Sequence, residues 1–86
     1  LVAPFVIPFN CTLVAMSASS ESASSWSAEV HIANTLVPGA NLIISASDTA
    51  YADKNISFLA GTRIQLYCNG VNIPFPRINM FLHRDS

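Results

Sequence analysis

The chain has 86 residues, of which 51% are hydrophobic and only 10% are charged, and its formal net charge is −1. This length allows one domain at most, and folding of so short a chain buries little more than about 60% of its surface. A nearly neutral chain without a clustered basic patch argues against nucleic-acid binding, and the absence of a run of about 18 or more apolar residues argues against membrane insertion.

The N-terminal stretch, LVAPFVIPF, is apolar, contains two prolines and has no basic leader, so we do not predict a secretory signal. Because an apolar start without methionine is unusual, we expect the chain to be the C-terminal part of a longer polypeptide. The next stretch, CTLVAMS, is apolar on both sides, which predicts a strand covered on both faces. We expect its outward face to carry Val14 and Met16.

A serine-rich stretch follows, in which seven of the eleven residues from Ser17 to Ser27 are serine. The segments on either side are too short to build a core separately, so a linker between two units is the weaker interpretation. We predict an exposed loop inside a single domain that spans residues 1–86. The candidate binding residues in this loop are Ser19, Ser20, Glu21 and Ser22.

Alternation of apolar and polar residues predicts half-buried strands at residues 26–34, 62–68 and 77–84. The stretch at residues 41–47, NLIISAS, is a shorter candidate strand. The inward positions of the three alternating strands are Trp26, Ala28, Val30 and Ile32 in the first, Ile64, Leu66 and Cys68 in the second, and Ile78, Met80 and Leu82 in the third.

Turn signals separate these strands: Pro38-Gly39, Gly61, Asn69-Gly70, and a connection in which Pro74 and Pro76 flank Phe75. No segment shows a helical period over three turns. The pattern therefore predicts an all-β fold, a compact antiparallel β-sandwich or jelly-roll-like domain of about seven to eight short strands.

The polar segment SDTAYADKN, residues 47–55, predicts a second exposed connection. It supplies Asp48, Tyr51, Asp53 and Lys54, a mixed set of side chains suited to contact with a sugar or a protein. An ordinary solvated loop is the alternative.

The two cysteines, Cys11 and Cys68, lack the spacing of a metal site. A disulfide between them would need an oxidising compartment. Because free cysteine is among the most buried residue types, we expect two buried, unpaired thiols.

We expect neither an enzyme nor a cofactor or metal site. The chain has no G-x-S-x-G motif to position a nucleophilic serine. His31 lies beside Glu29 on the polar face of its predicted strand and His83 lies near the C-terminus, so both are predicted to be solvated. A metal site made by His31 and Glu29 is the alternative, but a single pair of ligands two positions apart is weak support.

In chain order, the segments VAPFVIPFNCTLVAMSAS, SWSAEVHIANTLVPGANLII, ISFLAGTRIQLYCNG and PRINMFLHRD resemble the small C-terminal head or knob domains of tailed-bacteriophage fibre and capsid-decoration proteins. The resemblance covers nearly the whole chain and is one of pattern. It implies a jelly-roll-like, homotrimeric, non-enzymatic virion domain that caps a fibre or projects from a capsid. The chain lacks a His-x-His repeat, which argues against an axial iron site.

Two functions follow from this resemblance. The first is a structural knob at the virion surface, assembled in the bacterial host cytoplasm and attached to the capsid or a fibre shaft. The alternative is a host-attachment domain that recognises cell-surface glycan or protein through its exposed loops. The candidate residues of a trimer interface are Val14, Met16 and Phe81, since the chain has more phenylalanine than so small a core needs. That the phenylalanines fill the core of one chain is an equally supported interpretation.

Overall fold

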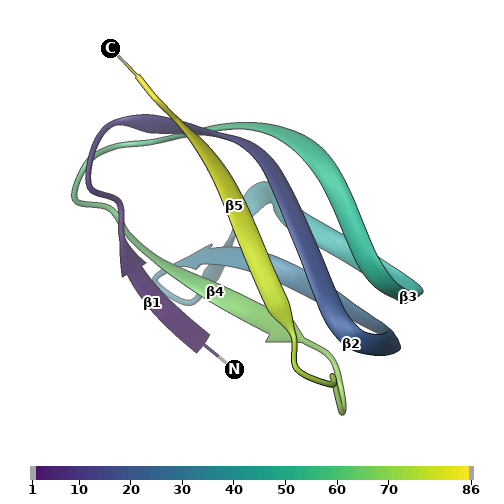
Figure 1. The fold of residues 1–86 in the computed structure, drawn as a ribbon. Coiled ribbons are helices and arrows are strands. Elements are labelled where there is room, and N and C mark those ends of the chain that lie inside the picture. Colours follow the sequence, from purple (N-terminus) through teal and green to yellow (C-terminus); the bar gives the residue numbers. More distant parts are fainter. Residues whose placement is uncertain (1, 86) are drawn as a thin grey trace.

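Five β-strands make up most of residues 2–85, which a computed structural model describes, with side chains from residue 5 onward. The strands are β1 (Val2–Val6), β2 (Cys11–Ile32), β3 (Thr35–Phe58), β4 (Arg63–Asn69) and β5 (Arg77–Arg84), and Figure 1 shows their arrangement. They form one sheet in which every pair is antiparallel. Residues 2–85 contain no helix, and therefore none long and apolar enough to cross a membrane.

Strands β2 and β3 are 22 and 24 residues long, and both bend near the middle, so that the sheet folds over on itself (Figure 1). The first half of β2 lies between β5 and the second half of β3. The second half of β2 lies between β4 and the first half of β3, and β4 also pairs with β1. We call these two parts of the sheet the β5 half and the β4 half.

The predicted all-β class and antiparallel pairing are confirmed, but the described strands are fewer and longer than expected. The predicted strands at residues 11–17 and 26–34 both belong to β2, and the stretch at residues 41–47 belongs to β3. The strands at residues 62–68 and 77–84 correspond to β4 and β5.

The prediction that the serine-rich stretch is a loop is wrong, because it is the bend of β2. Pairing with β3 is interrupted at the bend: it stops at Ser19 opposite Thr49, skips residues 20–23 and resumes at Ser24 opposite Ser47, with a further register irregularity before Trp26. At the bend the Oγ of Ser25 accepts a hydrogen bond from the backbone N–H of Ala46, 2.9 Å away. Small serine side chains let two paired strands bend together without crowding, and bulges supply the extra local twist.

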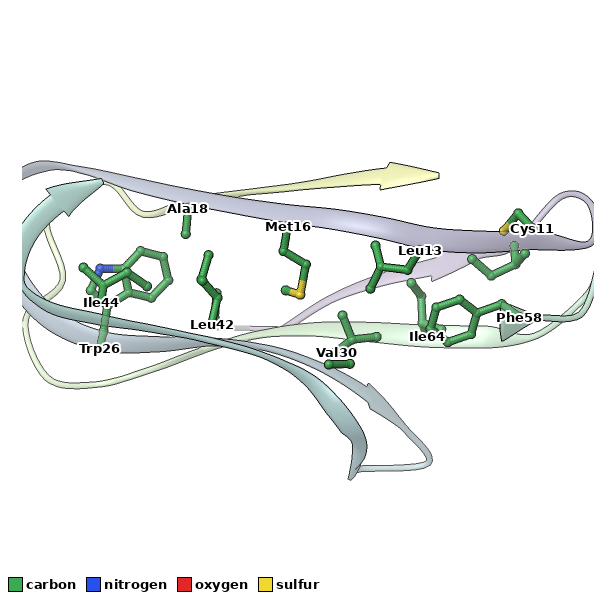
Figure 2. Packing of buried hydrophobic residues seen from close by; sticks show 13 residues of the cluster. Cys11, Leu13, Met16, Ala18, Trp26, Val30, Leu42, Ile44, Phe58 and Ile64 are labelled. Carbon is green, nitrogen blue, oxygen red and sulfur yellow. The ribbon is translucent and has the colours of Figure 1, made fainter. Parts of the chain in front are cut away.

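The core lies between the two halves of the sheet (Figure 2). The predicted inward side chains of Trp26, Ala28, Val30 and Ile64 are buried, whereas those of β5 are half-buried. Ile32 is exposed, contrary to prediction, because β2 leaves β4 after the pair His31–Gln65. Side chains from strands far apart in the sequence therefore meet in one cluster: Ile7, Cys11, Leu13, Met16, Ala18, Trp26, Ala28, Val30, Ala40, Leu42, Ile44, Phe58 and Ile64.

The turn signals are confirmed in part. Gly61, with φ of 85°, lies in the β3–β4 turn, and Gly70 and Phe75 lie in the β4–β5 connection. Pro38-Gly39 was predicted to be a turn but lies inside β3, in a bulge where residues 37–40 face Val30. The turn between β2 and β3 is instead Ala33-Asn34, in which both residues have positive φ, 51° and 65°.

Candidate interaction surface

The outer face of the β5 half brings together residues that the sequence assigned to two different sites. Across its three strands, Ser17 pairs with both Tyr51 and Asn79, and Ala15 pairs with both Asp53 and Phe81. The exposed fraction is 63% for Tyr51, 48% for Phe81 and 41% for Val14. We call these three side chains the outer patch.

The aromatic rings of the outer patch lie close to each other over the middle strand. The ring centroids of Tyr51 and Phe81 are 6.5 Å apart, and the ring planes are inclined by 55°. Ala15 lies between their strands and is buried without belonging to the core cluster, as expected for a small outward residue covered by larger neighbours. A small residue on the middle strand therefore lets the two rings approach across it.

A polar pair, the hydroxyl of Tyr51 and the carboxylate of Asp53, lies at the edge of the outer patch. The hydroxyl donates a hydrogen bond to Oδ1 of Asp53 at 3.1 Å. This bond to a carboxylate raises the pKa of Tyr51, and the negative charge of Asp53 adds to the effect. The surface at this point combines an open ring face with a carboxylate.

Met16 does not belong to this surface, and its assignment to a trimer interface together with Val14 is wrong. Its side chain is 0% exposed and lies in the core with Leu13 (Figure 2). A register irregularity between Leu13 and Ala15 puts an extra residue, Val14, into the strand. Such a bulge shifts the alternation of sides by one position, which strict period-two counting does not detect.

The other candidate binding residues lie on strands and not on loops, and they separate into three places. Ser19, Ser20, Glu21 and Ser22 lie on the bend of β2, and Asp48 lies on the adjacent bend of β3. Tyr51 and Asp53 lie on the outer face. Lys54 is turned away from it, and its Nζ donates a hydrogen bond to the backbone oxygen of Asn41 at 2.7 Å.

The connection between β4 and β5 contacts the bend of β2. The backbone N–H of Glu21 donates to the backbone oxygen of Pro74 at 2.9 Å. Phe75, next in the chain, is 72% exposed and has a positive φ of 48°. The predicted serine-rich site is therefore tied into the sheet, and the exposed apolar tip beside it is Phe75.

A second cluster lies on the β4 half, and the sequence predicted it incompletely. His31 Nε2 and Glu29 Oε1 are 2.7 Å apart, and Asn69 Nδ2 donates to Glu29 Oε2 at 3.3 Å. The hydrogen bond with His31 is the main cause that lowers the pKa of Glu29. The side chain of His31 is only 12% exposed, contrary to the prediction of a solvated histidine, whereas His83 is exposed as predicted.

The contacts of this second cluster occupy the carboxylate of Glu29 and Nε2 of His31, while Nδ1 of His31 is buried without a hydrogen-bond partner. A carboxylate accepts the bond from His31, so Nε2 carries the proton, and both carboxylate oxygens of Glu29 are occupied. Within residues 2–85 no three His, Cys, Asp or Glu side chains gather where they could hold a metal ion. The cluster is a group of polar side chains whose hydrogen bonds connect β2 to β4.

An open pocket of about 510 Å³ lies where β2 departs from β4. Ile32, Ala33 and the first part of β4, residues 62–65, line it. No sequence motif marks this pocket, because it results from the point at which two strands separate.

Comparisons of the chain with protein families, with curated proteins and with solved structures gave no match.

Proposed function

We propose that this chain is a non-enzymatic structural domain of a virion, a trimeric knob on a phage capsid or tail fibre with a β-sandwich or jelly-roll-like fold. The observation that carries the proposal is the outer patch, in which Val14, Tyr51 and Phe81 lie exposed on one sheet face. The two halves of the sheet that face each other across the core favour the sandwich class (Figure 2). The phage assignment rests on the resemblance of the sequence pattern, which is analogy.

Association would add stability that one chain of 9.2 kDa supplies poorly. Covering an exposed aromatic or aliphatic side chain is worth on the order of 1.5–3 kcal/mol when it becomes fully buried. The three side chains of the outer patch are neighbours, so a partner surface can cover them together. Exposed apolar side chains that gather in this way indicate a protein interface more often than isolated ones do.

Host attachment is the second candidate, because one observation favours it. The ring of Tyr51 and the carboxylate of Asp53 are presented side by side on the exposed face. A sugar can stack on an aromatic ring and donate its hydroxyl protons to a carboxylate. In this alternative the outer face would remain open to the host surface after assembly.

Sedimentation of the wild-type chain and of two matched phenylalanine variants tests the proposal. We expect a wild-type mass three times that of one chain. Phe81→Asp should dissociate the assembly, because a charge buried between chains lacks a partner. Phe75→Asp is the control: Phe75 is also exposed but lies in the β4–β5 connection, so this variant should stay trimeric.

A wild-type chain that sediments as a monomer at micromolar concentration would overturn the structural-knob proposal. If the wild type is a trimer and Phe81→Asp leaves it intact, the outer patch is free in the assembly. A glycan array should then show binding that Tyr51→Ala abolishes, which is the result expected of an attachment domain.

A further inference from the structure

The β5 half of the sheet ends in two open edges, one on each side. Within residues 2–85, strand β5 pairs with β2 alone, and so does the second half of β3. Open edges present unpaired backbone N–H and C=O groups, which are a template for pairing with another chain. A second copy of this chain is therefore a chemically suitable partner for either edge.

The two edges carry opposite charge. The β5 edge bears Arg77, His83 and Arg84, whose guanidinium lies over the ring of Phe9 at 5.0 Å from its centroid, and the carboxylate directly after the strand, Asp85, accepts a hydrogen bond from the hydroxyl of Thr12. The edge formed by the second half of β3 bears Asp48 and Asp53, and its single cation, Lys54, is engaged with the backbone of Asn41. This separation of charge favours contact between unlike edges over contact between like ones.

The register places Arg77 on one edge level with Thr49, the sequence neighbour of Asp48, on the other. Ser19 on the middle strand pairs with Thr49 on one side and with Arg77 on the other. Arg77 therefore occupies the same row as Thr49, directly beside Asp48 in sequence. Strands β3 and β5 are both antiparallel to β2, so they run in the same direction.

We infer that copies of this chain associate head to tail, with the basic β5 edge of one copy beside the acidic β3 edge of the next. An unstaggered continuation of the sheet puts Arg77 of one copy next to Thr49 and Asp48 of its neighbour. A head-to-tail contact closes into a ring when the rotation between copies allows it. The inference rests on the proposed trimer, and in such a ring the outer patches of the three copies face the common axis.

A symmetric contact of two identical edges is the competing arrangement. It would bring two β5 strands together, with basic side chains on both sides, or two β3 strands with acidic side chains on both sides. Like charges placed opposite each other across paired strands are destabilising. The two arrangements respond differently to charge reversal, which makes them separable by experiment.

Charge reversal at Arg77 and Asp48 tests the head-to-tail contact in the full chain. Arg77→Glu and Asp48→Arg should each raise the dissociation constant of the trimer about tenfold or more, as measured by sedimentation equilibrium. The double variant restores unlike charges at every interface of a ring and should recover most of the wild-type affinity. Arg63→Glu, which reverses an exposed charge on β4, is the matched control and should leave the dissociation constant unchanged.

Circular dichroism of each variant shows whether it folds, and the neutral variants Arg77→Gln and Asp48→Asn provide a milder test if a reversal unfolds the chain. With these, affinity should fall and lose part of its dependence on salt concentration. A trimer that tolerates both reversals, or whose loss is not rescued in the double variant, would overturn the edge contact and leave the proposed function standing. A monomeric wild type would overturn both.

Discussion

The imidazole of His31 stacks on the phenol ring of Tyr67, with the ring centroids 3.9 Å apart and the ring planes inclined by 22°. Tyr67 pairs directly with Glu29 across β2 and β4, so the stacked ring of His31 lies diagonally across the same ladder. The hydroxyl of Tyr67 in turn donates to Oδ1 of Asn34 in the β2–β3 turn at 3.0 Å. These contacts hold the imidazole in the orientation in which its Nε2 meets Glu29.

Stability at acid pH should depend on Glu29. Its ordinary pKa of about 4.5 is lowered in the folded chain, chiefly by the hydrogen bond with His31. A carboxyl group with a lowered pKa stabilises the fold above its ordinary pKa, and this contribution is lost as the pH falls through the lower folded value. We therefore expect the free energy of unfolding of the wild type to decrease as the pH is lowered from about 4.5 toward the folded-state pKa of Glu29.

Urea titrations at several pH values check this expectation. Glu29→Gln should flatten the acid limb of the stability curve, whereas Glu21→Gln, an exposed carboxyl on the same strand, is the control for the chemical change. An acid limb of the same steepness in Glu29→Gln and in the wild type would show that the pair with His31 is irrelevant to acid stability.

The β2–β3 turn should become more stable when Ala33 is replaced by asparagine. Ala33 has a φ of 51°, in the left-handed region where a residue with a Cβ atom is disfavoured by roughly 1–2 kcal/mol and asparagine is better tolerated. We expect Ala33→Asn to raise the free energy of unfolding by about 0.5–1 kcal/mol. Ala23→Asn, at an exposed position without positive φ, is the matched control, and an equal gain there would contradict the turn explanation.

The alternating patterns predicted local structure well because period two follows directly from strand geometry. The predicted inward sides of β4, β5 and the second half of β2 are confirmed for this reason, except at Ile32, which is exposed where β2 leaves β4. The pattern failed at Met16, because the bulge after Leu13 reverses which residues of the strand face the core. A bulge leaves no composition signal, since it is defined by the partner strand.

Longer-range features failed for a different reason. Serine-rich composition predicts exposure correctly at Glu21 and Ser22, but it does not distinguish a loop between two strands from a bend in one long strand that pairs with β3 on both sides of the bend. The outer patch joins Val14, Tyr51 and Phe81 from three strands, and its existence depends on the register of β2 with both neighbours. Single-sequence reasoning identified all three residues but assigned them to two separate sites.

Packing at Met16 should matter far more than at Val14, although the two residues are close in sequence. Met16→Ala removes a fully buried side chain and should lower the free energy of unfolding by about 2–5 kcal/mol. Val14→Ala should change it by less than about 0.5 kcal/mol in the dissociated chain. Denaturant unfolding at low protein concentration measures both, and comparable losses would contradict the observed bulge.

The two thiols should remain unpaired. Cys11 lies at the same end of the core as Ile64 (Figure 2), and Cys68 is four residues further along β4, about 13 Å at the rise of a β-strand. A disulfide needs Cα atoms within about 7 Å. Burial raises the pKa of both thiols, so alkylation of the folded chain should be slow.

Mass spectrometry after alkylation without reductant checks the state of the cysteines. Unfolded chain should carry two adducts, and folded chain should acquire them much more slowly. A mass lower by two hydrogens, with no adduct on unfolded chain, would show a disulfide and require that β4 or the start of β2 move.

Shortening the serine-rich bend should destabilise the fold, as expected for a bent strand and not for a free loop. Replacing residues 20–24 by a two-residue turn would remove the hydrogen bond from Glu21 to Pro74 and the contact of Ser20 with Ser24 at 3.0 Å. It would also shift the register between the two halves of β2, so that Trp26 could no longer enter the core while Ala18 remains there. We expect a marked drop in the midpoint of thermal unfolding, because loop length alone costs little while a lost register costs core packing. The matched control, Ser22→Ala at the unchanged length, should shift the midpoint only slightly. A shortened chain that unfolds at the wild-type temperature would show that the length of the bend does not determine which residues of β2 face the core.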